Sequence, residues 1–184
     1  MSALDPRERE RAHDRSLSAN FYDAALEASK SFRKGYDEQM NIVKWSQMPF
    51  ERSRHGLIKH IINEKMNTKE YCLDIYMQFL PGGMASGKHR HLSEEVFYVV
   101  EGQGYDLHWD VKFDCKDVME FEWEAEPRKF EWKQGDFVYI PPYCAHQHVN
   151  SDPKNEARII VVNSRIVKAM GFDWFEQLED AKGY

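Results

Sequence analysis

The stretch that decides the fold is GMASGKHRHLSEEVFYVVEG, residues 83–102. It begins and ends on glycine, and it carries His89 and His91 two positions apart, followed by Glu95 and the apolar run Val96–Val100. Residues two apart on a β-strand leave the same face of the sheet. The stretch therefore predicts two imidazoles side by side on one strand, as a metal held by two adjacent ligands requires.

A second stretch, GDFVYIPPYCAHQHVN at residues 135–150, adds His146 and His148. Glu95 can supply an anionic oxygen and His146 a third nitrogen. Three neutral imidazoles and one carboxylate suit Fe(II), Mn(II), Ni(II), Co(II) or Zn(II). The three cysteines of the chain have no CxxC spacing, which argues against a thiolate zinc site and against a disulfide framework.

The two stretches resemble the two motifs of the cupin superfamily. The first motif is a glycine, five residues, His-x-His, three or four residues, Glu, six residues and a glycine, and residues 83–102 match every spacing. The second is a glycine, five residues, Pro-x-Gly, two residues, His, three residues and Asn; residues 135–150 match it, except that Tyr143 stands where glycine is usual. The resemblance implies a β-barrel that holds one divalent metal ion, Fe(II) being favoured, through four ligands: His89, His91, Glu95 and His146.

A narrower resemblance concerns the segments His89-Arg90-His91 and His146-x-His148-x-Asn150, which are similar to gentisate-type ring-cleaving dioxygenase cupins. Those enzymes are typically two-cupin chains with a three-histidine iron site. This chain has one pair of motifs and keeps Glu95, so the identity of their substrate does not carry over.

Short apolar runs separated by turn residues surround the motifs, as in Leu73, Ile75, Met77 and Phe79, which alternate before Pro81. They predict an all-β fold, a cupin-type antiparallel β-barrel (double-stranded β-helix or jelly roll) with helical extensions at both ends. The expected division is a helical or irregular extension at 1–56, the barrel at 57–163 and a helical segment at 164–184.

Three local expectations follow from hydrophobic spacing. Apolar residues on one helical face between Phe21 and Phe32 predict a helix that stops at Gly35. Alternation over 119–123, followed by a turn at 126–128, predicts a hairpin with 129–132. After Asn163, the segments 166–170 and 174–178 are expected to be short helices separated by Gly171.

The chain has 184 residues, with 25 Lys and Arg against 31 Asp and Glu, a net charge of -6. A basic cluster for nucleic acid is lacking, no apolar run approaches the roughly 20 residues that span a bilayer, and the N-terminus lacks the apolar region of a secretory signal. These observations favour a cytoplasmic protein without nucleic-acid or membrane partners. We further expect a homodimer or larger homo-oligomer, because cupins commonly associate and the N-terminal helix has no obvious place inside a closed barrel.

Beyond the ligands, His148 is expected to project into the same barrel interior as His146, where it contacts substrate, transfers a proton or is hydrogen-bonded into the wall. Weaker candidates for a substrate pocket are Gln78, Tyr98, Tyr139 and Asn150. The remaining histidines, which have no ligand spacing, are expected to be ordinary surface or hydrogen-bonded residues: His13, His55, His60 and His108.

Three functions fit this site. The first is a mononuclear Fe(II) dioxygenase acting on a small aromatic or dicarbonyl acid, because the ligand set leaves open positions for an organic acid and O2. The second is a redox-silent isomerase, lyase or decarboxylase in which Mn, Zn or Ni polarises a carbonyl. The third is a non-catalytic cupin that binds a small ligand.

Overall fold

The computed structural model describes residues 20–69, 72–115 and 119–183, and the chain divides into two units, Met1–Gln39 and Met40–Tyr184. Within the first unit lies the helix α2 (Phe21–Tyr36), which carries Asp23 in its first turn, where a negative charge favours the helix dipole. The predicted helix is therefore confirmed, although Gly35 lies inside it and Tyr36 is its last residue. His13 lies outside the described residues.

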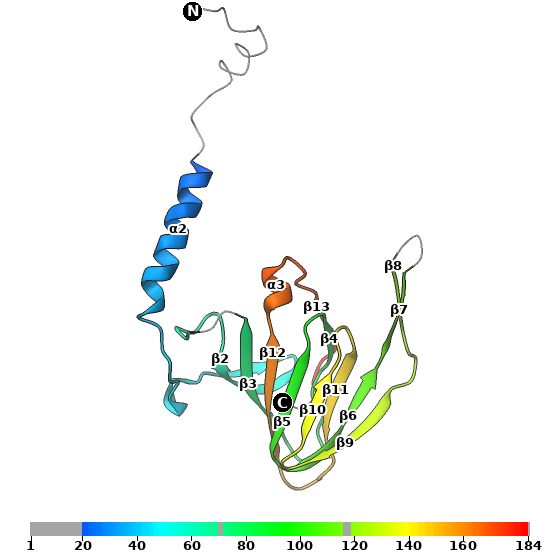
Figure 1. Cartoon of the computed structure of the whole chain (residues 1–184). Coiled ribbons are helices and arrows are strands. Elements are labelled where there is room, and N and C mark those ends of the chain that lie inside the picture. The colour runs from blue at the N-terminus through cyan, green and yellow to red at the C-terminus, as the bar shows by residue number, and fades with distance from the viewer. Residues whose placement is uncertain (1–19, 70–71, 116–118, 184) are drawn as a thin grey trace, which may run out of the picture. The chain divides into compact units, whose positions relative to one another are not determined.

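The second unit is built from antiparallel strands in two main sheets and one separate hairpin (Figure 1). The six-stranded sheet has the order β1-β2-β3-β12-β5-β10 and the five-stranded sheet the order β13-β4-β11-β6-β9. The bounds in chain order, together with a 3-10 turn at Trp45–Gln47 and the short helix α3, are β1 (Phe50–Ser53), β2 (Gly56–Ile62), β3 (Leu73–Leu80), β4 (Lys88–His91), β5 (Glu95–Glu101), β6 (Gln103–Trp109), β7 (Val111–Cys115), β8 (Met119–Trp123), β9 (Arg128–Lys133), β10 (Phe137–Ile140), β11 (Ala145–Asn150), β12 (Ala157–Ser164), α3 (Ile166–Ala169) and β13 (Phe175–Glu179). The all-β antiparallel architecture expected from the sequence is confirmed.

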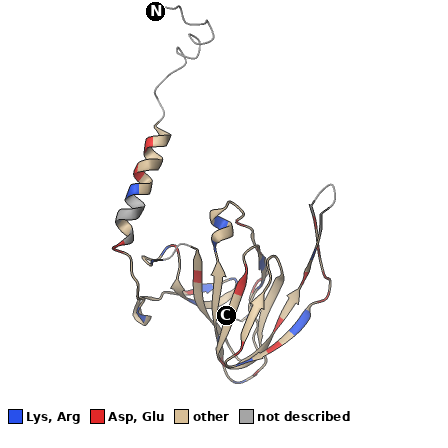
Figure 2. Ribbon diagram, viewed as in Figure 1, with Lys and Arg blue, Asp and Glu red and all other residues tan. Residues whose placement is uncertain are grey.

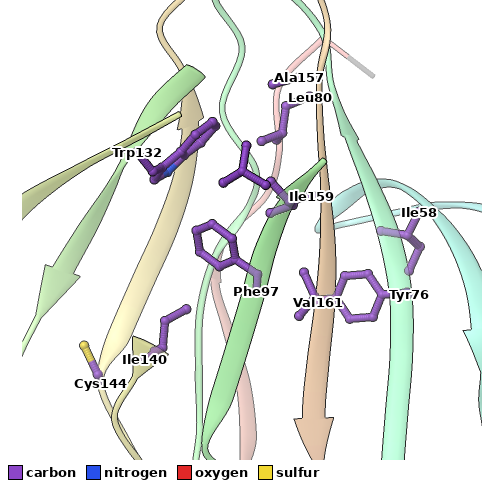
Figure 3. Packing of buried hydrophobic residues seen from close by; sticks show 11 residues of the cluster. Ile58, Tyr76, Leu80, Phe97, Trp132, Ile140, Cys144, Ala157, Ile159 and Val161 are labelled. Atoms are coloured by element: carbon purple, nitrogen blue, oxygen red, sulfur yellow. The ribbon is translucent and has the colours of Figure 1, made fainter. Parts of the chain in front are cut away.

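The apolar core lies between the two main sheets, and it follows directly from the alternation of buried residues along the strands. On β12, Ile159 and Val161 are fully buried, and on β5 Phe97 is fully buried in the same way. Figure 3 shows Phe97 among side chains from both sheets, with Trp132 of β9 on one side and Ile159 on the other. Because the same period places Glu95 on the inner face of β5 with Phe97, the core and the candidate metal ligands share one interior.

The predicted hairpin between 119–123 and 129–132 is wrong. Strand β8 pairs with β7, from Val111 opposite Trp123 to Cys115 opposite Met119, while β9 pairs with β6. The reason is the core: β9 brings Trp132 beside Gly104 of β6, where a Cβ on that glycine would stand 2.4 Å from the Trp132 ring. Burial of this indole, which is 3% exposed, outweighs a local turn at 126–128.

The C-terminal segment also differs from its prediction. Ile166–Ala169 is helical and Gly171 follows it with a φ of 87°, but Phe175–Glu179 is the strand β13. It pairs with β4, with Phe175 opposite His91 and Gln177 opposite His89. Backbone pairing along the edge of β4 decides the conformation here, where an i, i+4 apolar spacing had suggested a helix.

Strands also begin earlier than expected. The sheet begins at Phe50, because β1 pairs with β2 from Phe50 opposite Lys59 to Ser53 opposite Gly56.

Within the described part of the chain, none of the helices combines the length and the apolar character that a membrane crossing needs.

Candidate metal centre

The four residues that the cupin motifs single out meet at one point in the interior. His89 and His91 come from β4, His146 from β11 and Glu95 from the first position of β5, and each offers a ligand atom within 4.8 Å of the others. Direct pairing of His146 opposite His89 brings β11 and β4 together. All four side chains are buried.

The donor atoms of this group fit a metal ion. His91 Nδ1 donates to Ser93 O at 2.8 Å and His146 Nδ1 donates to Cys144 O at 3.0 Å, so the Nε2 atoms carry the lone pairs and face the cluster. Among the described residues, the buried atoms His146 Nε2 and Glu95 Oε1 have no hydrogen-bond partner. Ligating histidines in proteins usually donate their other N–H in this way, and a bound cation accounts for the inward atoms.

Charge in the site agrees with this arrangement. Burial, together with the neighbouring histidines, holds the pKa of His89 and that of His146 well below the ordinary value, so both rings are neutral. Burial opposes the charge of Glu95, but the contacts with His148 and His91 prevail and hold its pKa well below the ordinary value. Neutral imidazoles and an ionised carboxylate are the forms that bind divalent metals.

Behind Glu95 lies a second buried acid, Asp106 of β6, which accepts three hydrogen bonds. His148 Nδ1 donates to it at 3.0 Å, Trp132 Nε1 at 3.0 Å and His108 Nε2 at 3.3 Å. The other nitrogen of His148, Nε2, lies 3.5 Å from Glu95 Oε1. Burial lowers the pKa of His148, but the charges of Asp106 and Glu95 and their hydrogen bonds raise it to about 10.

A cavity of about 640 Å³ opens beside the cluster and reaches His89 and His55. Its apolar lining residues are Ile58, Tyr76 and Phe175. Its remaining lining residues are polar or charged: Glu51, Arg52, Ser53, Arg54, His60, Asp74, Asn163 and Gln177. The Phe175 ring stacks on His91, with centroids 6.2 Å apart and planes within 5°. One of the four candidate ligands, His89, thus borders a space large enough for a small organic molecule.

Three residues that the sequence suggested for substrate contact are absent from the lining of this cavity: His148, Gln78 and Asn150. His148 lies between Asp106 and Glu95 and is not among the residues that line the cavity. Gln78 is fully buried and its Nε2 donates to His55 O at 3.0 Å. Asn150, also buried, donates from Nδ2 to Leu80 O and Asn155 O, both at 2.8 Å. These contacts make Gln78 and Asn150 supports of loops, not cavity walls.

Tyr98 and Tyr139 are away from the cluster. Both are partly exposed, at 37% and 52%. Tyr98 packs on Phe137 with ring centroids 4.8 Å apart, and Tyr139 donates its hydroxyl to Glu94. Because Tyr98 follows the inward-facing Phe97 on β5, its side chain leaves the opposite face of the sheet.

Sequence reasoning missed three residues around the site: His55, Asp106 and His108. His55 and His108 were expected to be ordinary surface or hydrogen-bonded residues. His108, 3% exposed, is indeed hydrogen-bonded, but its acceptor is the buried Asp106 beside the site, and His55, 9% exposed, belongs to the histidine cluster. The sequence offered no signal for Asp106 or for His55. Asp106 reaches the cluster only because β6 pairs with β11, and His55 lies in a turn far from either motif.

The turn before His146 keeps its shape without the usual glycine. Tyr143 has a φ of 67°, the left-handed conformation that glycine adopts without strain. Its backbone N donates to His91 O at 2.8 Å. Its ring, 2% exposed, packs against the rings of Trp123 and Trp174, whose centroids are 5.2 and 5.0 Å away. Aromatic packing therefore holds the residue in a conformation that its own backbone disfavours.

The model of the auxin-binding protein family matches residues 34–181, which include both sheets and all four candidate ligands. The chain belongs to this family. Auxin-binding protein T92 of Nicotiana tabacum is 27% identical to it over 149 residues, 81% of this chain and 75% of T92.

Solved structures agree on the fold. The polyketide cyclase RemF from Streptomyces resistomycificus has a TM-score of 0.51 at 18% identity, covering 68% of this chain and 80% of RemF. The oxalate decarboxylase of Bacillus subtilis, a protein with Mn(II) centres, has a TM-score of 0.51 at 16% identity, covering 72% of this chain and 30% of that one. The fold is that of the cupin superfamily, as the two motifs predicted.

Basic and acidic residues are interspersed along the strands (Figure 2). Several of them form ion pairs between neighbouring strands. Arg90 of β4 pairs with Glu176 of β13 at 2.5 Å, and the guanidinium of Arg90 lies 3.7 Å from the centroid of the Trp123 ring. These contacts attach β13 and the β7-β8 hairpin to the strand that carries His89 and His91. They help to fix the wall of the candidate site.

Proposed function

We propose that this protein is a metal-dependent cupin that binds one divalent ion through His89, His91, Glu95 and His146 and takes a small aromatic or dicarbonyl acid beside it. The observation that carries the proposal is the buried three-histidine, one-glutamate group, in which His146 Nε2 and Glu95 Oε1 have no hydrogen-bond partner among the described residues and which adjoins, at His89, a cavity of about 640 Å³. When bound, the ion supplies a Lewis-acidic centre, and Fe(II) also supplies redox chemistry with O2.

The charges favour an anionic ligand. Without metal, the two buried carboxylates of Glu95 and Asp106 together carry more charge than the protonated His148 that lies between them. A divalent ion reverses this balance and leaves a net positive charge in a low-dielectric interior, where an incoming carboxylate is stabilised. The apolar walls Tyr76 and Phe175 suit an aromatic or similarly flat molecule.

The chain's own residues divide the remaining tasks. His148, held by Asp106, positions the Glu95 carboxylate from behind. We therefore assign His148 to orienting Glu95, in place of the substrate contact or proton transfer suggested by the sequence. Phe175 lies over His91 and limits access of water from that side. Tyr143 ties the turn before His146 to the backbone of β4.

Two outcomes remain for the bound acid. An Fe(II) dioxygenase is our first candidate, because a four-ligand site of this type leaves positions open for both an acid and O2. Binding without turnover is the second, and the family supports it, since T92 is named an auxin-binding protein.

The test begins with metal. Elemental analysis after reconstitution should find about one ion per chain, and Glu95→Gln should lower this content; absence of metal in the reconstituted wild type contradicts the proposal. Calorimetric titration of the loaded protein with hydroxybenzoates, catechols, diketones and an auxin then identifies the ligand class. An oxygen electrode, with protein loaded anaerobically with iron, distinguishes the two outcomes: ligand-dependent O2 uptake supports the dioxygenase, whereas tight binding without uptake supports the binding protein.

A further inference from the structure

His55 lies at the inner end of the cavity, in the turn between β1 and β2. Its ring centroid is 4.3 Å from that of His89 and 5.7 Å from that of His148, with the planes near perpendicular in both pairs. The residue is 9% exposed and lines the same cavity as His89. It is therefore the histidine outside the two motifs that comes nearest to the candidate metal site within the described residues.

The backbone of His55 is held from three sides. Its carbonyl accepts hydrogen bonds from Gln78 Nε2 at 3.0 Å and from Gly87 N at 3.1 Å, while its own N donates to Ser53 Oγ at 3.2 Å. Gly87 fits closely against this turn, since a Cβ there would stand 2.6 Å from Arg54 O. These hydrogen bonds fix the backbone that carries the imidazole ring. The buried side chain of Gln78 supplies one of them.

Both ring nitrogens of His55 lack a hydrogen-bond partner among the described residues. This separates it from His91 and His146, whose outward nitrogens are satisfied by backbone carbonyls. Burial, together with the charge of His148, lowers the pKa of His55 to about 3, which leaves one N–H donor and one lone pair. An unpaired buried polar atom destabilises the folded protein, and a ligand in the adjoining cavity would supply these two nitrogens with a hydrogen-bond partner.

We propose that His55 recognises the ligand, by a hydrogen bond to a second polar group on an acid whose carboxylate lies at the metal. This inference rests on the proposed function and narrows its ligand class to acids with a hydroxyl or carbonyl group near the carboxylate. An acid that lacks the second group leaves the imidazole unpaired and binds more weakly. His55 is then a specificity-determining residue and not a fifth metal ligand.

The experiment compares two acids on two proteins loaded with Zn(II), which excludes reaction with O2. Benzoate and 2-hydroxybenzoate are titrated calorimetrically into the wild type and into His55→Phe, which keeps a flat ring but has no nitrogen. Any part of the preference for 2-hydroxybenzoate that does not involve His55 is common to both proteins, so only the change in preference between the proteins measures His55. We expect that preference to fall by about 3–10-fold in the variant, the usual value of one hydrogen bond, and His55→Gln to restore part of it.

Two further readouts separate the alternatives. Zinc content should stay near one ion per chain in His55→Phe; its loss would make His55 a ligand and overturn the inference. The melting temperature of the variant should match or exceed that of the wild type, because an unpaired buried ring has been replaced by an apolar one, and a marked fall would mean that the nitrogens have partners within the protein. An unchanged preference rejects the role of His55 alone, whereas failure of the wild type to bind either acid rejects the proposed function and the inference with it.

Discussion

Replacing Asp106 by alanine should be among the most damaging single changes in the interior. The substitution removes the acceptor of hydrogen bonds from His148, Trp132 and His108, all at 3.0–3.3 Å and all buried. Each unpaired donor costs about 1–3 kcal/mol, and breaking a buried ion pair on one side costs about 3–5 kcal/mol. Because His148 can respond by losing its proton, these costs overlap, and we expect a total loss of about 3–5 kcal/mol in the free energy of unfolding.

The matched variant Asp106→Asn separates charge from packing. Asparagine keeps the size and one carbonyl oxygen, so at least one donor stays paired and the loss should be about 1–2 kcal/mol. Both variants release His148 from its orientation behind Glu95, and loss of such an outer contact typically lowers metal affinity by about 10–100-fold. Urea unfolding of the metal-free proteins measures the first quantity, and competition for Zn(II) with a chromophoric chelator measures the second.

The free energy of unfolding should depend on pH differently in the metal-free wild type and in Asp106→Asn. The pKa of His148 rises from 6.5 to about 10 on folding, so its stabilising contribution in the metal-free protein is complete below pH 6.5 and is lost as pH rises through 10. Asp106→Asn removes the main charge that raises this pKa and should reduce the alkaline loss of stability. If Asp106→Ala cost less than about 1 kcal/mol and left zinc affinity unchanged, the reasoning from this network would be refuted.

Further predictions concern neighbouring residues. His146→Gln should lower metal content sharply, whereas His148→Gln should keep about one ion per chain with reduced affinity; the reverse result on elemental analysis would contradict our ligand assignment. Tyr143→Phe should leave stability unchanged or raise it, because the buried hydroxyl has no hydrogen-bond partner among the described residues, while Tyr143→Gly should lose about 2–3 kcal/mol, since aromatic packing outweighs the strain relieved. A thermal melt of the two variants ranks these effects. Burial and Asp110 raise the pKa of Cys144 to about 12, so its thiol should react with iodoacetamide far more slowly than that of partly exposed Cys72, and equal rates by mass spectrometry would be inconsistent with its burial.

How much of the site the sequence can predict depends on where its residues stand. The spacing of His89, His91 and Glu95 is a property of one strand, a turn and the next strand, so a motif carries it. Asp106 and His55 reach the cluster only through pairing of β6 with β11 and through the turn at β1, and no local pattern encodes either meeting.

The same distinction applies to the fold. Alternation predicted an antiparallel barrel, because burial of one strand face is local information. It did not predict which strand pairs with which: β8 joins β7 instead of β9, and β13 is a strand because β4 offers it an edge. The Tyr143 turn illustrates the converse, since a residue that looked unsuitable is held by Trp123 and Trp174, which lie far away in the sequence.

The candidate ligands also come from different layers. Glu95 belongs to the six-stranded sheet, and the three histidines belong to the five-stranded sheet. An ion bound by all four would link the two sheets, so a coordination bond would have to break before the sheets could separate. If this link between the sheets is absent from the folding transition state, it slows unfolding more than it speeds folding. The supply of metal would then govern how long each folded molecule survives, and a cell poor in that metal would lose the protein through faster turnover before any equilibrium between folded and unfolded chains was reached.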